Sequence, residues 1–476
     1  MKYYGIYIGS LLTQLQRRRC FLKDNTAVIA EINQKLGSGQ RLACVRSFGC
    51  QLNVSDGEKI KGLLKKMGYS FTEDEEKSDL IILNTCAVRE SAEDRVFGIV
   101  GSYKKLKEKK PSLILGIAGC MTAQSHIAEK IKKSYPQVDL VVGTSALSSL
   151  PGLILECLSG SRFAQDISEY DDFSEAAEQV RESTFKASVP IMFGCNNFCT
   201  YCIVPYVRGR ERSRQAQDII SEVKGLVKEG YKEIMLLGQN VNSYGKDISG
   251  GMSFPELLRA INDIPGDFII RFMSSHPKDA SKELIDTIFD CDKVAKHLHL
   301  PVQSGSSDVL TRMNRHYTVD KYLETVEYIR SRDPEFSLTT DLIVGFPNET
   351  EEEFQQTLHL VQKVKYDNIY SFIYSKRSGT KAAEMPDAVS EEEKGQRMRR
   401  LLEVQREVSS EFYKRFIGRN MRVLVDGVSK KREGYVSGKS SEFIIVEFPG
   451  DSSLIGQFAD VKITGAMNWA VIGEQI

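Results

Sequence analysis

Apolar runs that end in a cysteine-bearing turn recur three times in the first third of the chain. Residues 42–48, 79–83 and 112–118 form these runs, and each is followed by a stretch whose apolar positions have helical spacing. Strands joined through helices pair in parallel, because the helix returns the chain to the edge where the strand began. The pattern therefore predicts a parallel sheet with covering helices over residues 41–157.

Six further strand candidates occur in the central part of the chain. They lie at residues 189–193, 233–237, 268–274, 297–302, 338–344 and 369–374. Amphipathic stretches, such as 217–229 and 351–364, separate them. Six strand–helix units in succession are typical of an open or partial (β/α)6 barrel, which we expect over residues 185–412.

The last part of the chain changes pattern twice. Residues 390–416 are charged and carry apolar side chains at helical spacing, which predicts a connecting helix packed on the barrel. These side chains are Leu401, Val404, Val408 and Phe412. Short apolar runs separated by Gly, Lys and Ser come next, at residues 421–426, 434–437, 443–447 and 459–463. They predict a small all-β barrel over residues 413–476.

The amino-acid composition indicates the remaining domain boundaries. Residues 162–182 are acidic and poor in large apolar side chains, so we place an interdomain linker over residues 158–184. Residues 1–40 show no clear link to the rest of the chain and are treated as an N-terminal extension of uncertain order. The predicted fold class is α/β, with an N-terminal parallel α/β domain, a central partial barrel and a small C-terminal all-β barrel.

The length and the net charge of the chain limit the classes of protein to which it can belong. A chain of 476 residues exceeds one hydrophobic core, so several domains are expected. The 64 basic residues balance 64 acidic ones, so any nucleic-acid contact must come from local basic patches. No run is long enough to span a bilayer, and the apolar start lacks the basic segment and cleavage site of a secretory signal. We expect a cytoplasmic monomer with no membrane partner.

The most specific local feature is a run of three cysteines directly after a predicted strand. Cys195, Cys199 and Cys202 are separated by gaps of three and two residues, and thiolates this close suit a cubane iron–sulfur cluster better than a disulfide. Three ligands for four irons leave one iron open to a small molecule, here the amino and carboxylate groups of S-adenosylmethionine. A structural zinc site is the alternative, but no fourth ligand follows closely, since the next histidine is His276.

A second set of three cysteines is spread over the first domain. Cys50, Cys86 and Cys120 lie 36 and 34 residues apart, which is about one strand–helix unit each time. A single buried cysteine is more often an inert core residue than a ligand. Three at the carboxyl edge of one parallel sheet, each beside a small or turn-forming residue, predict a second three-thiolate cluster. The cysteines interpreted as ordinary thiols are Cys20, Cys44, Cys157 and Cys291.

Polar residues at the ends of the barrel strands form the predicted cofactor pocket, because ligands gather at that end of such barrels. The residues assigned to it are Gln239, Asn240, Ser274, Gln303 and Asp341, together with Phe198 and Tyr201 inside the cysteine run. Any one of them alone is as often a strand cap or a loop turn. His299, in an apolar strand, is more often a hydrogen-bonded core residue than a ligand.

Two groups of basic residues are candidates for contact with RNA. Arg208 and Arg210 lie just beyond the cysteine run, and their guanidinium groups suit phosphates or a cofactor carboxylate. The second group lies in the all-β tail with Tyr435 and Phe443 interleaved, a pattern that suits an RNA backbone. It consists of Arg419, Arg422, Lys430, Lys431 and Arg432. Solvated strands or hairpins paired with acids are the alternative for both groups.

Four segments together resemble the methylthiotransferase family of radical S-adenosylmethionine enzymes. They are residues 48–53 (FGCQLN), 84–90 (NTCAVRE), 119–120 (GC) and 195–214, of which the last is similar to the MiaB type. The resemblance covers about residues 41–476. Its order of an N-terminal methylthiotransferase domain, a radical domain and a TRAM domain matches the three predicted domains.

The resemblance implies a conversion of N6-isopentenyladenosine, at position 37 next to the anticodon of tRNA, into its 2-methylthio derivative. It implies that the cysteine run holds the radical 4Fe–4S cluster and that the spread set holds an auxiliary 4Fe–4S cluster that supplies or carries the sulfur. Two molecules of S-adenosylmethionine are consumed in such a reaction. The implied partners are tRNA, an electron donor of the flavodoxin or ferredoxin type, and a sulfur source, and no catalytic side chain is expected beyond the cluster ligands.

Two alternatives stay open on the sequence alone. A sister enzyme of the same family would act on threonylcarbamoyl-adenosine of tRNA or on a ribosomal-protein aspartate, although the cysteine run favours the isopentenyl substrate. A non-catalytic RNA-binding protein with structural zinc is the alternative of another class. Iron and sulfide analysis distinguishes that protein from any radical enzyme.

Overall fold

The computed structural model describes residues 25–37, 39–87, 90–169, 179–467 and 469–476. The chain divides into two compact units, the first made of residues 1–182 with 206–209 and the second of residues 183–205 with 210–476. Cys20 and residues 170–178 of the predicted acidic linker lie outside the described residues. Among the described residues, no helix is both long enough and apolar enough to cross a membrane.

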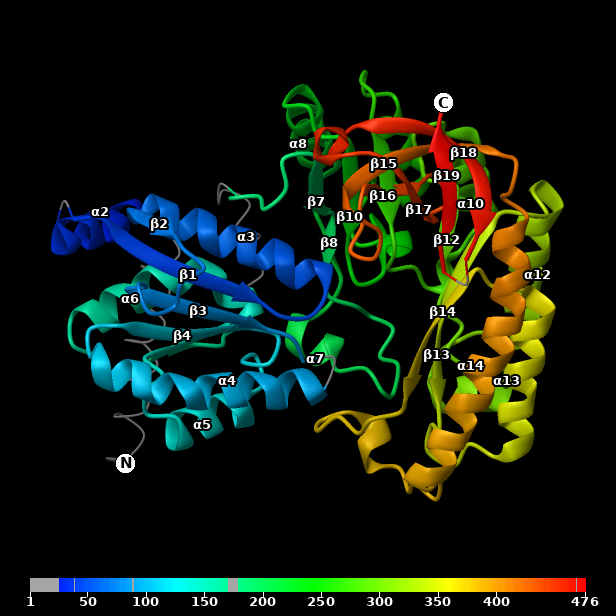
Figure 1. The fold of residues 1–476 in the computed structure, drawn as a ribbon. Coiled ribbons are helices and arrows are strands. Elements are labelled where there is room, and N and C mark those ends of the chain that lie inside the picture. Colours follow the sequence, from blue (N-terminus) through cyan, green and yellow to red (C-terminus); the bar gives the residue numbers. More distant parts are fainter. Residues whose placement is uncertain (1–24, 38, 88–89, 170–178, 468) are drawn as a thin grey trace. The chain divides into compact units, whose positions relative to one another are not determined.

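The first unit is built on a six-stranded parallel sheet with the order β2-β1-β3-β4-β5-β6 (Figure 1). Its strands are β1 (Arg41–Ser47), β2 (Tyr69–Phe71), β3 (Leu80–Thr85), β4 (Ile114–Gly119), β5 (Leu140–Gly143) and β6 (Ala164–Asp166). The predicted parallel sheet is confirmed. Every residue of β3 and β4 is buried, because both faces of the sheet are covered, which explains their continuous apolar runs.

Helices cover both faces of this sheet. They are α2 (Asn25–Leu36), α3 (Gln51–Lys66), α4 (Glu90–Lys109), α5 (Ser125–Ser134) and α6 (Leu150–Leu158), with the short 3₁₀ helix η1 (Thr144–Ser149). Side chains of α2, α3 and α6 pack in the core on one face, and side chains of α4 and α5 pack in the core on the other. Helix α2 lies inside the predicted extension, and its Ile32 and Leu36 are buried in this unit, so residues 25–36 belong to the fold.

The second unit contains six parallel strands in two three-stranded sheets, β11-β10-β7 and β12-β13-β14. They are β7 (Lys186–Pro190), β10 (Glu233–Leu237), β11 (Ile269–Phe272), β12 (His297–His299), β13 (Ser337–Val344) and β14 (Asn368–Ile373). A parallel bridge between Ile270 and Val294 extends β11 toward the chain that enters β12. The six predicted strands and the partial barrel are confirmed.

Helices surround these strands. The longer ones are α8 (Ala216–Lys228), α9 (Phe254–Asn262), α10 (Lys282–Asp290), α12 (Val319–Arg332), α13 (Glu351–Val364) and α14 (Glu391–Lys414). Shorter elements are β8 (Met192–Phe193), α7 (Val204–Arg208), β9 (Arg212–Ser213), η2 (Val241–Ser243), η3 (Pro277–Asp279), α11 (Ser307–Arg312) and η4 (Lys381–Glu384). Residues 206–209, at the end of α7, group with the first unit. Leu401 of α14 is buried in the same core as the barrel strands, as the spacing predicted.

The tail closes into a five-stranded barrel, in the order β15-β16-β17-β19-β18. Its strands are β15 (Asn420–Val428), β16 (Tyr435–Ser440), β17 (Ile445–Pro449), β18 (Phe458–Ala466) and β19 (Val471–Gln475), with η5 (Ser452–Leu454) before β18. The predicted all-β barrel is confirmed. The strand β19 was not predicted, because its sequence VIGEQ has only two apolar residues before a glycine.

Candidate functional site

The spread cysteines come together at one edge of the first sheet. Cys50 lies between β1 and α3, Cys86 follows β3, and Cys120 follows β4. These three strands are neighbours and parallel, so their carboxyl ends meet. The structure therefore places the set where the sequence predicted it.

Two glycines allow the turns at this edge to approach each other. Gly49 has φ +111°, and a Cβ on it would lie 2.3 Å from the Cβ of Cys86. Gly119 has φ +105°, and a Cβ on it would lie 2.3 Å from the carbonyl oxygen of Thr85. A side chain at either position would push apart the segments that carry the cysteines.

Buried polar side chains connect the sulfurs of Cys50 and Cys120. The Sγ of Cys50 is 3.3 Å from the Oδ1 of Asn53, and the Sγ of Cys120 is 3.9 Å from the same oxygen. Arg208 donates from Nε to the Sγ of Cys120 at 3.1 Å and from Nη2 to the Oδ2 of Asp56 at 2.8 Å. The expectation that Arg208 faces RNA is wrong, because its side chain is 5% exposed and lies within the first unit.

The charges and the burial around the spread cysteines act differently on the pKa values of Cys50 and Cys120. A hydrogen bond from the Cys86 side chain lowers the pKa of Cys50 to about 6, and the charge of Arg208 acts in the same direction against the effect of burial. Burial raises the pKa of Cys120, which Arg208 counteracts. Cys50 is exposed, whereas Cys86 and Cys120 are buried.

The cysteine run lies in the loop after β8 in the second unit. The backbone N–H of Thr200 donates to the carbonyl of Met313 at 3.0 Å, and its hydroxyl donates to the carbonyl of Arg312 at 2.9 Å. The amide of Asn314 donates to the carbonyls of Asn197 and Phe198 at 3.3 and 3.0 Å. The segment between α11 and α12 thus holds this loop in place.

A second buried arginine contacts the cysteine run. Arg315 donates from Nη1 to the Sγ of Cys199 at 3.4 Å and from Nη2 to the carbonyl of Pro301 at 2.7 Å. Its Nε donates to the hydroxyl of Tyr317 at 3.1 Å. Arg315 was not predicted as a site residue, because it lies between two helices rather than at a strand end and matches no motif.

Burial keeps the thiols of Cys195 and Cys202 protonated. It raises the pKa of Cys195 to about 11 and the pKa of Cys202 to about 12. Iron ligands must be thiolates, so loading a cluster here would release protons.

The residues at both sets fit iron–sulfur clusters. Each set offers three sulfur ligands and a buried arginine whose N–H points at one sulfur, and hydrogen bonds to cluster sulfurs are a known means of tuning such centres. No group of three His, Cys, Asp or Glu side chains within the described residues is arranged to hold a single metal ion. A cubane binds each thiolate to a different iron, so its ligands do not have to converge on one point.

The predicted cofactor pocket contains polar atoms without partners. The side-chain oxygens of Gln239 and Asn240, after β10, are buried and accept no hydrogen bond within the described residues. Buried oxygens of this kind are expected where a ligand supplies the donor. Gln303 follows β12 with φ +74°, and Ser274 follows β11. Asp341 lies on β13, with its Oδ1 3.4 Å from the Nε2 of His299, and Tyr201 packs against Phe346 and its neighbours.

The basic residues predicted to contact RNA differ in their exposure and in their ion-pair partners. Arg210 is exposed and its guanidinium lies 4.3 Å from the ring centre of Phe198. In the five-stranded barrel, Arg419 pairs with Glu335, and Arg422 pairs with Asp267 at 2.6 Å, so both tie this barrel to the partial barrel. The hairpin between β15 and β16 carries the exposed Lys430 and Lys431 and the half-buried Arg432, which pairs with Glu447 at 3.5 Å.

Three family models match successive parts of the chain, in the same order as the three predicted domains. Residues 43–143 match the model of the "Uncharacterized protein family UPF0004", residues 189–361 that of the "Radical SAM superfamily", and residues 414–475 that of the "TRAM domain". Among solved structures, the radical S-adenosylmethionine methyltransferase TsrM from Kitasatospora setae has a similar fold. It has a TM-score of 0.52 at 13% identity, over 72% of this chain and 77% of that one.

Relatives of known name match nearly the whole chain. The tRNA-2-methylthio-N(6)-dimethylallyladenosine synthase of Thermoanaerobacter pseudethanolicus is 48% identical over 458 residues, which are 96% of this chain and 97% of the relative. The protein of the same name from Acetivibrio thermocellus is 47% identical over 476 residues, covering 99% and 98%. The chain therefore belongs to the tRNA-2-methylthio-N(6)-dimethylallyladenosine synthases, the MiaB-type radical S-adenosylmethionine methylthiotransferases.

Proposed function

We propose that this protein is the enzyme that converts N6-isopentenyladenosine, next to the anticodon of tRNA, into its 2-methylthio derivative. The names of its relatives and the order of its three family matches support this activity. The observation that carries the proposal is the pair of three-cysteine sets, each with a buried arginine that donates to one sulfur.

The two sets are assigned different clusters. Cys195, Cys199 and Cys202 would hold the 4Fe–4S cluster that binds S-adenosylmethionine, and the set at residues 50, 86 and 120 would hold the auxiliary 4Fe–4S cluster. Bound there, the clusters and S-adenosylmethionine supply the radical and sulfur chemistry that an unactivated aromatic C–H requires, since no side chain can remove that hydrogen as a proton.

The side chains of the protein would bind and orient the cofactor and exclude water from the site. The unpartnered oxygens of Gln239 and Asn240 are suited to accept hydrogen bonds from the cofactor. The segment 312–315 fixes the cysteine loop through its backbone and side-chain hydrogen bonds. The buried side chains of Arg208, Arg315, Cys86, Cys120 and Cys199 help to keep water away from the reacting groups.

The remaining assignments follow from the family. The five-stranded barrel and Arg210 are proposed to contact tRNA, an electron donor of the flavodoxin or ferredoxin type is proposed to reduce the clusters, and an external sulfur source to replace the transferred sulfur. We place the protein in the cytoplasm as a monomer.

Anaerobic reconstitution followed by nucleoside mass spectrometry tests the activity. We expect two clusters per chain and the 2-methylthio derivative of N6-isopentenyladenosine as the product. Cys199→Ala should abolish 5′-deoxyadenosine formation and leave one cluster, whereas Cys291→Ala, at a buried cysteine outside both sets, should leave two clusters and full activity. A modified threonylcarbamoyl-adenosine would indicate the sister enzyme, and zinc in place of iron would refute the proposal.

A further inference from the structure

A cavity of about 200 Å³ lies within the second unit, between the partial barrel and the five-stranded barrel. The amino-terminal ends of β13 and β14 form one side, and the loop between β16 and β17 with Trp469 forms the other. Its aromatic lining consists of Tyr370, Tyr413, Phe443 and Trp469. Its polar lining consists of Ser337, Thr339, Asp367, Asn368, Ser409, Lys439 and Glu442.

The loop between β16 and β17 is held firmly against the barrel strands. Arg271 of β11 donates to the carbonyl of Ser440 at 2.7 Å, and the hydroxyl of Ser337 donates to the carbonyl of Glu442 at 2.8 Å. Phe443 stacks on His297 with ring centres 4.8 Å apart and planes 15° apart. Phe443 has φ +67°, a conformation that costs energy for a bulky residue and persists only where its surroundings fix it.

Two aromatic rings of the cavity remain open to solvent. Trp469 is 39% exposed and Tyr370 is 36% exposed. The ammonium of Lys431 lies 4.0 Å from the ring centre of Trp469, and Tyr370 meets the ring of His299 edge-on. Open aromatic faces beside amide and hydroxyl groups are the usual setting in which proteins stack and read single-stranded bases.

The charges of the lining distinguish a base from a phosphate. Asp367, Glu442 and Lys439 all line the cavity, so the lining has no surplus of positive charge that would favour a phosphate inside it. A neutral base with N–H donors suits these groups and the amide of Asn368. Lys430 and Lys431, on the neighbouring hairpin, are exposed and suit the phosphates of the same strand.

We propose that this cavity binds a nucleobase of the tRNA other than the adenosine that reacts, with the base stacked on Trp469 and Tyr370. The inference rests on the proposed function, since it takes tRNA as the substrate. The cysteine run lies at the carboxyl ends of the barrel strands, whereas the cavity lies at the amino-terminal ends of β13 and β14. The eight residues of β13 separate these ends by roughly 23 Å, at about 3.3 Å per residue, or about seven stacked base steps.

The chain offers a direct reporter, because Trp469 is its single tryptophan. The full-length reconstituted protein would be titrated with a synthetic anticodon stem-loop RNA that carries N6-isopentenyladenosine. We expect the RNA to quench the tryptophan fluorescence and to protect it from acrylamide. Trp469→Ala should weaken RNA binding about tenfold, while Trp469→Phe, which keeps a stacking ring, should retain most of the affinity.

Two controls separate stacking from other effects. Leu402→Ala removes an apolar side chain of α14 that is 50% exposed and does not line the cavity, so it should leave binding unchanged. Thermal unfolding of each variant shows whether its fold is intact. If the Trp469→Ala variant does not fold, Tyr370→Ala provides the same test, because it removes the aromatic ring on the opposite side of the cavity.

The outcomes distinguish this inference from the proposed function. If the wild-type protein binds and modifies the RNA while its fluorescence stays unchanged and Trp469→Ala binds equally well, the cavity does not hold a base. Equal loss of affinity in Trp469→Ala and Trp469→Phe would overturn the stacking contact. If the wild-type protein neither binds nor modifies tRNA, the proposed function itself fails.

Discussion

A buried arginine donates to one cysteine sulfur in each of the two units. Arg208 reaches Cys120 from 88 residues away, and Arg315 reaches Cys199 from 116 residues away. Each arginine also has a second anchor, Asp56 for Arg208 and the carbonyl of Pro301 for Arg315. The guanidinium groups are therefore fixed in direction, and each affects the cysteine set that it contacts.

Arg315→Lys tests this assignment at the radical cluster. Lysine keeps the charge but cannot donate to Cys199, Pro301 and Tyr317 together, as the planar guanidinium does. We expect both clusters to form and the formation of 5′-deoxyadenosine to fall at least tenfold, the usual cost of losing a group that orients a metal ligand.

Arg208→Lys is the matched variant at the other set. It should leave 5′-deoxyadenosine formation near the wild-type rate and lower the yield of methylthiolated tRNA, because Arg208 contacts Cys120. An equal loss of 5′-deoxyadenosine in the two variants would show that the arginines do not act on separate clusters.

Glu349 connects the loop after β13 to α14. Its Oε2 accepts from the N–H of Gly345 at 2.8 Å and from Arg397 at 3.1 Å. Burial raises the pKa of Glu349 from 4.5 to about 7, although both of these contacts lower it. Between these pH values the folded protein keeps a proton that the unfolded chain has lost.

The stability of the second unit should therefore decrease as the pH rises from about 5 to about 7, by on the order of 3 kcal/mol from this group. Glu349→Gln removes the titration and should flatten this part of the stability curve. Thermal unfolding of the reconstituted protein across the range measures it. A decline of the same size in the variant would assign the pH dependence to other groups.

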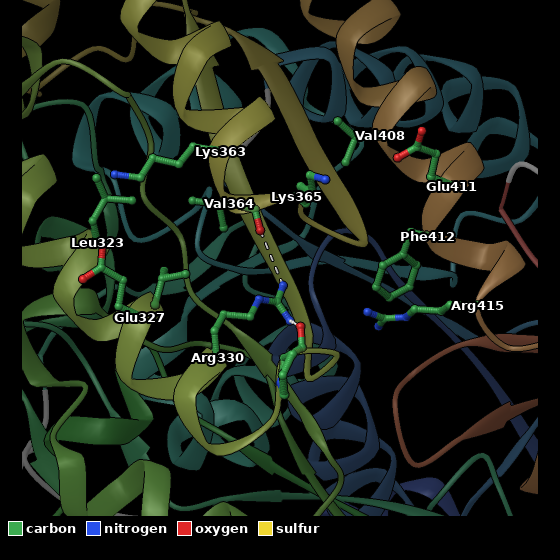
Figure 2. A pocket seen from close by; sticks show the side chains of 12 residues that line it. Leu323, Glu327, Arg330, Lys363, Val364, Lys365, Val408, Glu411, Phe412 and Arg415 are labelled. Atoms are coloured by element: carbon green, nitrogen blue, oxygen red, sulfur yellow. Dashed lines mark hydrogen bonds between the residues drawn. The ribbon is translucent and has the colours of Figure 1, made fainter.

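At the scale of elements, the carboxyl ends of α12, α13 and α14 enclose a cavity of about 420 Å³ (Figure 2). Arg330 projects into it, and its guanidinium donates to the carbonyls of Pro334 at 3.1 Å and of Val364 at 3.5 Å, as well as to Phe336. Val364 is the last residue of α13, where carbonyls lack partners within the helix, and Pro334 and Phe336 lie in the turn between α12 and β13. Arg330 thus satisfies carbonyls that no helix or strand pairs.

Arg330→Met should destabilise the second unit by about 2 kcal/mol, since charge-assisted hydrogen bonds to several carbonyls are lost while most of the side-chain volume is kept. Lys363→Met changes an exposed basic side chain that lines the same cavity and should alter stability by less than about 0.5 kcal/mol. Chemical unfolding of both variants measures the difference. If the two variants lose similar amounts of stability, Arg330 contributes only its positive charge, as Lys363 does, and its hydrogen bonds add nothing.

The elements that the sequence predicts carry a local apolar pattern, whereas those it misses lack one or depend on contacts between distant segments. Strands such as β3 and β10 carry apolar runs and were predicted, whereas β19 (VIGEQ) has only two apolar residues before its glycine. The cysteines were found because their spacing follows the strand–helix repeat. Arg315 and Trp469 were missed because their contacts come from segments far away in the sequence, which no local pattern reveals.

At the scale of the whole molecule, the balance of 64 basic and 64 acidic residues leaves recognition of a polyanion to local groups. The five-stranded barrel carries two kinds of basic residue. Arg419 and Arg422 are paired with Glu335 and Asp267 of the partial barrel, so their charges are already balanced. Lys430 and Lys431 are exposed on a hairpin, and neither forms an ion pair within the described part of the chain.

This difference predicts how tRNA affinity depends on salt. Each phosphate that a lysine neutralises releases counterions and adds about 0.7–0.9 to the slope of log affinity against log salt concentration. The double variant Lys430→Gln, Lys431→Gln should therefore reduce this slope by about 1.5, whereas Arg419→Gln and Arg422→Gln should change it far less, because their guanidinium groups serve carboxylates. Filter binding of tRNA at a series of salt concentrations measures the slope. A larger reduction in the arginine variants would mean that these ion pairs open in the complex and that the two arginines, rather than the hairpin, carry the contact with the RNA backbone.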